Sequence, residues 1–222
     1  TSSYGEGADH LRAALAAGGY DVDFIRNHDA PTAFPSTAEG LAQYGCVILS
    51  DIGTNTLVLA PATWERGQPT PNRLKLLREY VQNGGGLIMV GGYLTFQGIE
   101  GKGRWAGTPV EEVLPVTLQT VDDRVECPEG IEPRVVEEHA IVSGLEATWP
   151  AVLGYNRVTA RPDAQVLVRV GDDLLVASRE VGQGRTIAYT TDCGPHWCPP
   201  PFVAWPGYQT LWQQMVGWVA RR

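Results

Sequence analysis

Three polar, glycine-containing segments each follow a short apolar run, and they hold most of the side chains that could do chemistry. They are Ser50–Asn55 (SDIGTN), Gly91–Gly98 (GGYLTFQG) and Thr190–Trp197 (TTDCGPHW). The last segment places Cys193 three residues before His196, with Asp192 beside them. A thiol, an imidazole and a carboxylate are the groups that nucleophilic amide hydrolysis needs, because a base must activate the thiol and a third group must orient the base.

Each segment also has a purely structural interpretation. Asp51 and Asn55 are residue types that cap turns and helix starts. Gly91 and Gly92 suit a tight chain reversal, and His196 could simply pack between its neighbours. A functional role is favoured by the number of these segments, because three polar loops at strand ends exceed what folding alone requires.

The elements that must position these segments alternate between helix and apolar strand. The runs Cys46–Ser50, Leu87–Val90 and Arg185–Thr191 predict strands, and apolar spacing predicts helices over 5–18, 71–83 and 207–220. Such alternation is typical of a parallel sheet with crossover helices. Ligands bind where loops leave the carboxyl ends of parallel strands, so the three polar segments are expected to converge on one crevice.

Other parts of the chain are expected to differ in secondary structure. Residues 20–25 alternate like a half-exposed strand, and the capping-box spacing that begins at Ser36 predicts a short helix to Tyr44. The proline-dense segment 197–206 is predicted to exclude a regular helix. Residues 116–189 read mainly as strands and turns, with a hairpin joining 164–170 to 174–178. Residues 1–222 are predicted to form a single domain with a β-rich insertion or edge over about residues 115–180.

Length, charge and composition exclude several classes of protein. The 222 residues include 17 Lys and Arg against 25 Asp and Glu, a net charge of −8 that offers nucleic acid no basic face. Apolar residues make up 43% and charged residues 19%, which excludes disorder, and no apolar run approaches the length of a membrane span. Four cysteines are too few for a disulfide scaffold, and no secretory signal is seen, so a cytoplasmic location is predicted.

Several stretches resemble class I glutamine amidotransferase-like proteins of unassigned reaction. They are VILSDIG at 47–53, PNRL at 71–74, GGGLIMVGGY at 84–93, LPVT at 114–117, GYNR at 154–157 and DCGPHW at 192–197. The resemblance implies a flavodoxin-like α/β fold, a three-layer sandwich around a mostly parallel central sheet. Proteins of this group begin with one more strand ahead of the first helix, so a strand is expected to be missing upstream of residue 1.

The resemblance also implies a catalytic layout in which a cysteine stands at a tight strand-to-helix elbow. That position falls on or beside Tyr93, and no cysteine occurs between Cys46 and Cys127. The histidine that activates the nucleophile best matches His196, and the loop that supplies oxyanion amides matches Asp51–Asn55. A phenol with an ordinary pKa of about 10 is a poor replacement for a thiolate, so the resemblance alone does not imply glutamine hydrolysis.

The leading hypothesis is a protein that binds a small polar metabolite in the strand-end crevice and lacks the usual cysteine nucleophile. The candidate catalytic residues are His196, Cys193, Asp192 and Tyr93. The candidate ligand-binding residues are Asp51, Gly53, Asn55, Gly92, Asn72, Arg73, Asn156 and Arg157. No cofactor and no metal site is predicted, because the cluster from Asp192 to Cys198 does not match the usual zinc spacings.

Two alternatives remain open. One is a thiol-dependent amidohydrolase or glutaminase with Cys193 as nucleophile and His196 as base, although neighbours in a tight turn rarely align for proton transfer. The other is a non-catalytic subunit that docks a partner, such as a second copy, through the aromatic segment Trp197–Trp212. The expected partners are therefore a small polar metabolite and another copy of the chain, with neither nucleic acid nor membrane.

Overall fold

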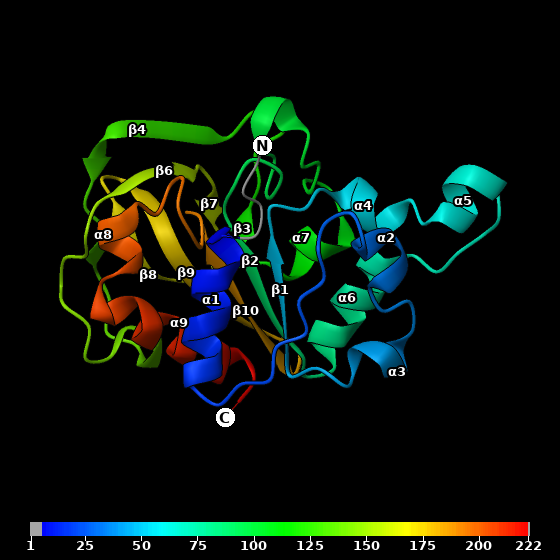
Figure 1. Ribbon diagram of the computed structural model, residues 1–222, viewed down its shortest axis with the longest axis horizontal. Coiled ribbons are helices and arrows are strands. Elements are labelled where there is room, and N and C mark those ends of the chain that lie inside the picture. Colours follow the sequence, from blue (N-terminus) through cyan, green and yellow to red (C-terminus); the bar gives the residue numbers. More distant parts are fainter. Residues whose placement is uncertain (1–5, 222) are drawn as a thin grey trace.

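The computed structural model describes residues 6–221, without the side chains of residues 6 and 7, and is built around a mixed sheet of six strands (Figure 1). The strands lie in the order β1-β2-β10-β9-β8-β5. Their bounds, in that order, are Cys46–Ser50, Gly86–Val90, Gly184–Tyr189, Asp173–Val181, Gln165–Val170 and Arg134–Val135. The three strands predicted to carry the polar segments, β1, β2 and β10, are neighbours.

Strand directions divide this sheet into two halves. β1, β2 and β10 are parallel to one another, whereas the pairs β10–β9, β9–β8 and β8–β5 are antiparallel. The prediction of a mostly parallel, flavodoxin-like sheet is therefore wrong for the second half. The cause lies in the connections, because turns at 171–172 and 182–183 join β8, β9 and β10, and two-residue turns join only antiparallel neighbours. The predicted hairpin is confirmed.

Helices cover both faces of the sheet, which gives three layers (Figure 1). The bounds of the four covering helices are α1 Glu6–Ala17, α9 Pro206–Val219, α6 Arg73–Gln82 and α7 Pro109–Val113. Alternate residues of β2 point to opposite faces, as in any strand. Ile88 and Val90 pack in one core with α1 and α9, and Leu87 and Met89 pack in the other with α6 and α7.

The remaining elements are short. The other helices are α2 Ala30–Ala33, α3 Ala38–Leu41, α4 Thr54–Val58, α5 Pro61–Arg66 and α8 Pro200–Val203, with 3₁₀ turns η1 Ile99–Gly101 and η2 Ala140–Val142. Two small antiparallel ladders pair β3 Val116–Thr117 with β7 Thr159–Ala160 and β4 Arg124–Ile131 with β6 Val152–Asn156. The β4–β6 ladder supplies part of the functional site described below.

Three local predictions differ from the structure. Residues 20–25 form no strand, because their alternation describes exposure and supplies no neighbouring strand. The helix expected over 36–44 is reduced to α3, and its cap is Thr37, whose hydroxyl accepts the Gly40 N–H at 3.1 Å. A helix does form in the proline-dense segment. Pro200 and Pro201 occupy the first turn of α8, where a missing N–H breaks no helical hydrogen bond.

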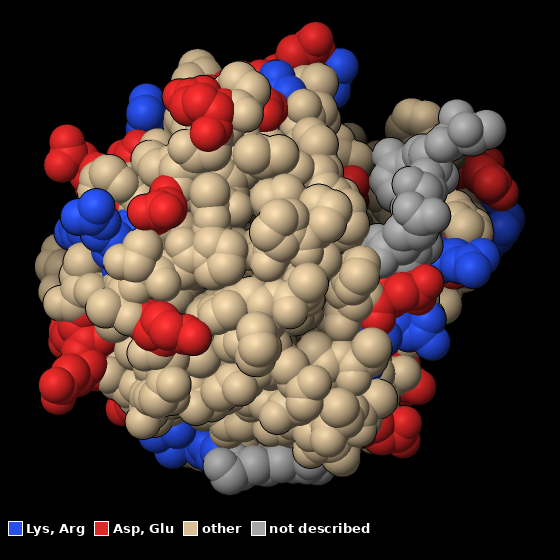
Figure 2. Space-filling model, turned by 60° about the vertical axis from the view of Figure 1, so that its left-hand side comes forward, with Lys and Arg blue, Asp and Glu red and all other residues tan. Residues whose placement is uncertain are grey.

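Charged side chains are scattered over the surface. On the face that carries α8 and α9, carboxylates and basic groups surround a central area that has neither, and no basic stripe crosses this face (Figure 2). Within residues 6–221, no helix is both long and apolar enough to cross a membrane.

Candidate functional site

The loops that follow β1, β2 and β10 meet at one edge of the sheet. The Leu94 N–H donates to Asp51 Oδ1 at 3.0 Å, which joins the first loop to the second. The rings of Tyr93 and His196 lie 4.8 Å apart, edge to face, which joins the second loop to the third. These contacts follow from the parallel directions of the three strands. We call Asp51, Gly92, Tyr93, Asp192 and His196 the strand-end cluster.

Asp51 is held in a strained conformation immediately after β1. Its φ of 46° lies in the left-handed region, which Asp tolerates better than most residues. The backbone is anchored because the Asn27 side chain donates to the Asp51 carbonyl at 3.3 Å. Non-glycine residues in this region concentrate at functional sites, where surrounding contacts fix them. The conformation directs the carboxylate to the loop after β2.

Gly91 and Gly92 bring that loop against β10 and the Asp51 carboxylate. A Cβ on Gly91 would lie 2.0 Å from the Thr190 carbonyl oxygen, so only glycine fits there. A Cβ on Gly92 would lie 3.2 Å from Asp51 Oδ1 and 3.5 Å from Thr95 Oγ1. The Thr95 hydroxyl is buried without a hydrogen-bond partner. Two polar oxygens thus face the space beside Gly92.

Asp192 is the titratable group of the cluster that is best suited to move a proton. Its Oδ1 accepts the Cys193 N–H at 2.6 Å, and its Oδ2 lies 4.0 Å from His196 Nδ1. Burial raises the pKa of Asp192 to about 7, and the nearby Asp51 carboxylate adds to that rise. A carboxyl group with this pKa is partly protonated at neutral pH and can act as acid or base.

His196 stands at the exposed rim of the cluster. Its side chain is 45% exposed, and its ring stacks on that of Trp197 with centroids 5.5 Å apart. Its φ of 144° is uncommon for a residue with a side chain. The 4.0 Å separation from Asp192 is longer than a hydrogen bond. The two groups are therefore close enough for a bridging molecule to contact both.

A wall formed by Arg124 and Glu126 of β4 with the rings of Tyr93 and Trp197 borders the cluster, and the sequence analysis missed the two β4 residues. Glu126 accepts the Tyr93 hydroxyl at 3.1 Å through Oε1 and the Trp197 indole N–H at 2.9 Å through Oε2. The Arg124 guanidinium lies 4.5 Å from the centre of the Tyr93 ring. Burial and the Glu126 contact raise the Tyr93 pKa, so the phenol stays protonated. Tyr93 can donate a hydrogen bond but is not a nucleophile.

Asn156 acts beneath the cluster and does not line it. It is fully buried, accepts the Gly92 N–H at 2.9 Å and donates to the Gly92 carbonyl at 3.2 Å. It also donates to Asp123 Oδ1 at 2.8 Å, and Asp123 in turn accepts the N–H groups of Gln97 and Gly98. This network fixes the loop after β2. Asn156 is a positioning residue, and Asp123 is one that the sequence analysis missed.

Cys193 lies below the cluster, away from its exposed rim. It is 4% exposed, and its Sγ lies 3.6 Å from Ser50 Oγ. Burial, reinforced by Asp192, raises the pKa of the Cys193 thiol to about 12. A reactive cysteine needs the opposite shift. The neighbouring Cys198 is also buried, and its thiol donates to the Asp192 carbonyl at 2.7 Å.

The elbow of working amidotransferases has no counterpart after β2. A nucleophile elbow is a sharp turn from strand to helix. Here the chain passes from Val90 through a series of bends, and the next helical turn in the described chain, η1, begins only at Ile99. Tyr93 occupies this bend, so both the thiol and the helix that would carry it are missing.

Three other predicted ligand residues lie at or near the starts of helices. Gly53 is the N-cap of α4 and Asn55 lies exposed on that helix. Asn72 caps α6 by accepting two backbone N–H groups, from Leu74 at 3.0 Å and Lys75 at 3.2 Å. Its side-chain oxygen is therefore committed to the helix start.

The two arginine candidates also lie apart from the cluster's contacts. Arg73 is buried, donates to the Pro31 carbonyl at 2.9 Å, and lines a separate cavity of about 270 Å³ beside α5. Arg157 forms an ion pair with Asp173 at 2.9 Å. The residues of the PNRL and GYNR stretches therefore have structural roles. Asn72 caps a helix and Arg73 binds a backbone carbonyl. Asn156 holds the loop after β2, and Arg157 forms an ion pair.

Comparison with known proteins places the chain in a family. Residues 1–221 match the family described as "Putative glutamine amidotransferase". The cytoplasmic proteins STM3548 and STM1381 from Salmonella typhimurium share 42% and 41% sequence identity with the chain, and both superpose with a TM-score of 0.94. In each case 99% of this chain and 89% of the other are covered.

More distant structures share the fold alone. A thua-like protein from Parabacteroides merdae has 15% identity and a TM-score of 0.61, covering 99% of this chain and 87% of its own. No match is found among curated proteins. The full-length family match and two relatives above 40% identity lead to one conclusion: the chain belongs to the glutamine amidotransferase-like family.

Proposed function

We propose that the protein binds a small polar metabolite at the strand-end cluster and that any reaction there uses carboxyl and imidazole groups in place of a thiolate. The observation that carries this proposal is the raised pKa of Asp192, about 7, next to the Asp51 carboxylate and His196. A buried carboxyl group with a strongly raised pKa beside other ionisable side chains is typical of functional sites.

The chemistry of the cluster favours a ligand with N–H or O–H donors. Asp51, Asp192 and Glu126 supply acceptors, and Tyr93 with Trp197 supplies an aromatic wall. The unpartnered Thr95 hydroxyl offers one further hydrogen bond beside Gly92. An amide, an amine or a hydroxylated small molecule satisfies these groups, and a multiply charged anion does not.

The thiol-dependent alternative is disfavoured by the state of Cys193. With a pKa of about 12, its thiol is almost entirely protonated at neutral pH. The oligomer alternative loses its main support too, because Trp197, Phe202, Tyr208 and Trp212 are buried within the chain's own core.

A cytoplasmic location is proposed by analogy with the two Salmonella relatives, which are named as cytoplasmic proteins. Within the described residues, no disulfide joins the four cysteines. Reduced thiols are the usual state in a reducing compartment.

The test combines turnover with binding. Glutamate release from L-glutamine is measured for the wild type and for Cys193→Ser, and a series of amides, amines and amino acids is screened by thermal shift at pH 6, 7 and 8. We expect no glutamate release and a stabilising ligand whose effect changes around pH 7. Asp192→Asn should abolish that pH dependence, whereas Asp172→Asn, in the β8–β9 turn, should keep it.

Either of two results would contradict the proposal. Glutamate release that disappears in Cys193→Ser would make the thiol the nucleophile. Ligand stabilisation that is unchanged in Asp192→Asn and in His196→Gln would place the binding site elsewhere.

A further inference from the structure

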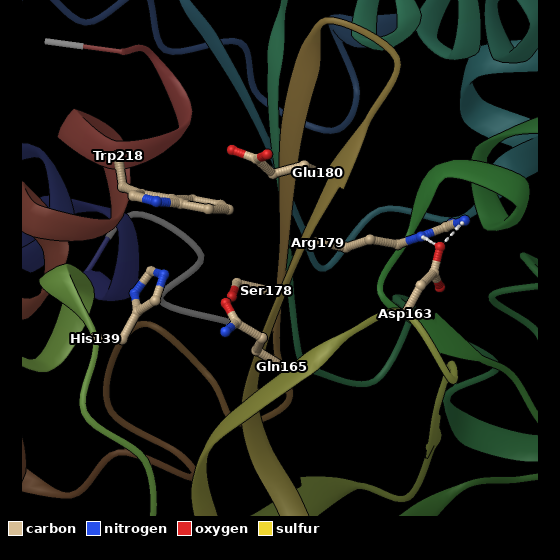
Figure 3. Close-up of a pocket in the computed structure, with 7 residues that line it drawn as sticks. All are labelled: His139, Asp163, Gln165, Ser178, Arg179, Glu180 and Trp218. Carbon is tan, nitrogen blue, oxygen red and sulfur yellow. Dashed lines mark hydrogen bonds and ion pairs between the residues drawn. The ribbon is translucent and has the colours of Figure 1, made fainter.

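A polar cavity of about 320 Å³ lies at the end of the sheet opposite the strand-end cluster. It opens between α9, the start of η2 and strands β8 and β9. In Figure 3 the side chains of His139, Ser178, Gln165 and Trp218 surround one space, while Asp163 and Arg179 extend to the other side of β9. We call His139, Gln165, Ser178, Glu180 and Trp218 the polar hollow.

Ser178 is the residue in this hollow that folding does not explain. It is 1% exposed, and its hydroxyl has no hydrogen-bond partner among residues 6–221. A buried hydroxyl without a partner destabilises the fold, and alanine at this position would avoid the cost. Figure 3 shows the Ser178 oxygen facing the hollow. The hydroxyl is therefore placed to bond to a molecule that enters this space.

The neighbouring groups have fixed hydrogen-bonding roles. His139 Nδ1 accepts the Ile141 N–H at 3.1 Å, so its Nε2 carries the hydrogen and is a donor. Burial lowers the His139 pKa, so the ring is neutral at pH 7. Gln165 Nε2 donates to Glu137 Oε1 at 3.3 Å, which leaves the Gln165 carbonyl oxygen as an acceptor. Together with Ser178, the hollow offers a donor, an acceptor and a hydroxyl that can be either.

The charged side chains that line the hollow are each paired with a residue of opposite charge. Arg179 binds Asp163 at 2.8 Å, and Arg185 binds Glu180 Oε1 at 2.8 Å. The Arg185 guanidinium also lies 4.8 Å from the Trp218 ring centre. The lining residues present no unpaired charge, so the lining itself favours neither an anion nor a cation. The Glu137 carboxylate beside Gln165 and His139 adds one negative charge at the edge of the hollow, which disfavours an anion. The indole supplies an apolar surface, as in most small-molecule pockets.

We propose that the polar hollow binds a small neutral polyhydroxylated molecule, a monosaccharide or a polyol. Each hydroxyl of such a ligand both donates and accepts, which matches the mixed roles of Ser178, His139 and Gln165. The C–H face of a sugar ring packs on the Trp218 indole. The Glu180 carboxylate, bound to Arg185 through one oxygen, keeps the other as an acceptor. This site is independent of the strand-end cluster and of the function proposed for it.

The experiment measures binding of neutral and charged probes to the full chain by saturation-transfer NMR and calorimetry. The neutral probes are methyl α-D-glucopyranoside, myo-inositol and glycerol, and the charged ones are glucuronate and glucosamine. We expect a neutral probe to bind more tightly than either charged probe. Ser178→Ala should weaken that binding about tenfold, the loss expected for one hydrogen bond.

The same variant separates a ligand role from a structural one. Without ligand, Ser178→Ala should raise the midpoint of thermal unfolding, because it removes an unpartnered hydroxyl. The matched control is Thr95→Val, which removes another buried hydroxyl without a partner in the described chain, beside Gly92 of the strand-end cluster. It should also raise the midpoint but leave probe binding to the hollow unchanged.

Three outcomes would overturn the proposal. They are the absence of binding by every neutral probe, equal affinity of the wild type and Ser178→Ala, and a crystal structure grown with the probe in which the hollow contains water alone. Loss of probe binding in Thr95→Val but not in Ser178→Ala would assign the probe to the strand-end cluster instead.

Discussion

The two ends of the central sheet hold their charged groups in opposite ways. At the carboxyl ends of the parallel strands, Asp51 and Asp192 lie near each other, and within residues 6–221 neither forms an ion pair with Lys or Arg. At the other end, Glu180 and Asp163 are each paired with an arginine. Burial raises the pKa of Asp192 to about 7, whereas Arg179 lowers the pKa of Asp163. The first end is suited to proton transfer and the second to recognition of neutral ligands.

The largest expected effect concerns the close approach that assembles the first end. Gly91→Ala places a Cβ 2.0 Å from the Thr190 carbonyl oxygen, so β2 and β10 must separate where their loops begin. We expect the free energy of unfolding to fall by about 3 kcal/mol or more, measured by urea denaturation. Gly45→Ala is the control, because its Cβ comes no nearer than 3.4 Å to another atom. Equal losses in both variants would contradict the explanation.

The next effect tests whether ionisation of Asp192 at the first end destabilises the folded protein. Asp192 ionises with a pKa of 3.8 when unfolded and about 7 when folded. The folded state holds this proton more tightly, so the stability that the group contributes is full below pH 4 and is lost as the pH rises through 7. Asp192→Asn should therefore raise the free energy of unfolding by roughly 1–3 kcal/mol at pH 8 and by little at pH 4.

Urea denaturation of the wild type and Asp192→Asn at both pH values checks this expectation. Asp172→Asn, in the β8–β9 turn, serves as the control and should show no such difference between pH 4 and pH 8. A stability gain of the same size at both pH values would mean that ionisation of Asp192 is not its cause.

A smaller effect is expected at the second end, where the Glu180–Arg185 ion pair is predicted to set the preference for neutral ligands. Glu180→Gln removes the carboxylate that neutralises Arg185, which makes the net charge around the polar hollow one unit more positive. Binding of glucuronate should then improve about threefold relative to methyl α-D-glucopyranoside, since partly exposed charges interact by less than about 1 kcal/mol. Calorimetry with the two probes measures the ratio. An unchanged ratio would show that the ion pair does not set the charge preference.

The smallest expected effect concerns the wall beside the first end. Tyr93→Phe removes the hydrogen bond to Glu126 Oε1 but keeps the ring against Arg124. We expect a loss of about 0.5–1 kcal/mol in the free energy of unfolding, because the bond is exposed. Tyr44→Phe, which loses a similar exposed bond to Asp23, is the control. A loss in Tyr93→Phe several times that of the control would mean that the wall supports the fold.

How far the sequence could predict this molecule depends on how local each feature is. The runs at Cys46–Ser50 and Leu87–Val90 are local patterns, and the structure contains both strands. Turn lengths set the partners of β9. The sequence analysis predicts the hairpin of β8 and β9 but not that β9 also pairs with β10. Glu126 was missed because a glutamate on a short strand carries no signal until the β4–β6 ladder is placed.

The candidate site shows the same division. Asp51, Tyr93, Asp192 and His196 were predicted together because each follows a strand whose direction could be inferred. Asn72 and Arg73 were grouped with them by resemblance, but Asn72 caps a helix and Arg73 binds backbone carbonyls. Side-chain polarity alone does not distinguish a ligand contact from a structural hydrogen bond.

The place of β10 in the sheet has a consequence for how the protein is made. β10 pairs with β2 on one side and β9 on the other, and no strand follows it within residues 6–221. Chains emerge from the ribosome at roughly 5–20 residues per second. Several seconds therefore pass between the synthesis of β1 and β2 and that of residues 184–189, which form β10. During that time the edge of β2 that later pairs with β10 has unpaired backbone groups. This edge and the Gly91–Gly98 loop can then associate with other chains. We expect refolding to be slow and its yield to fall as protein concentration rises.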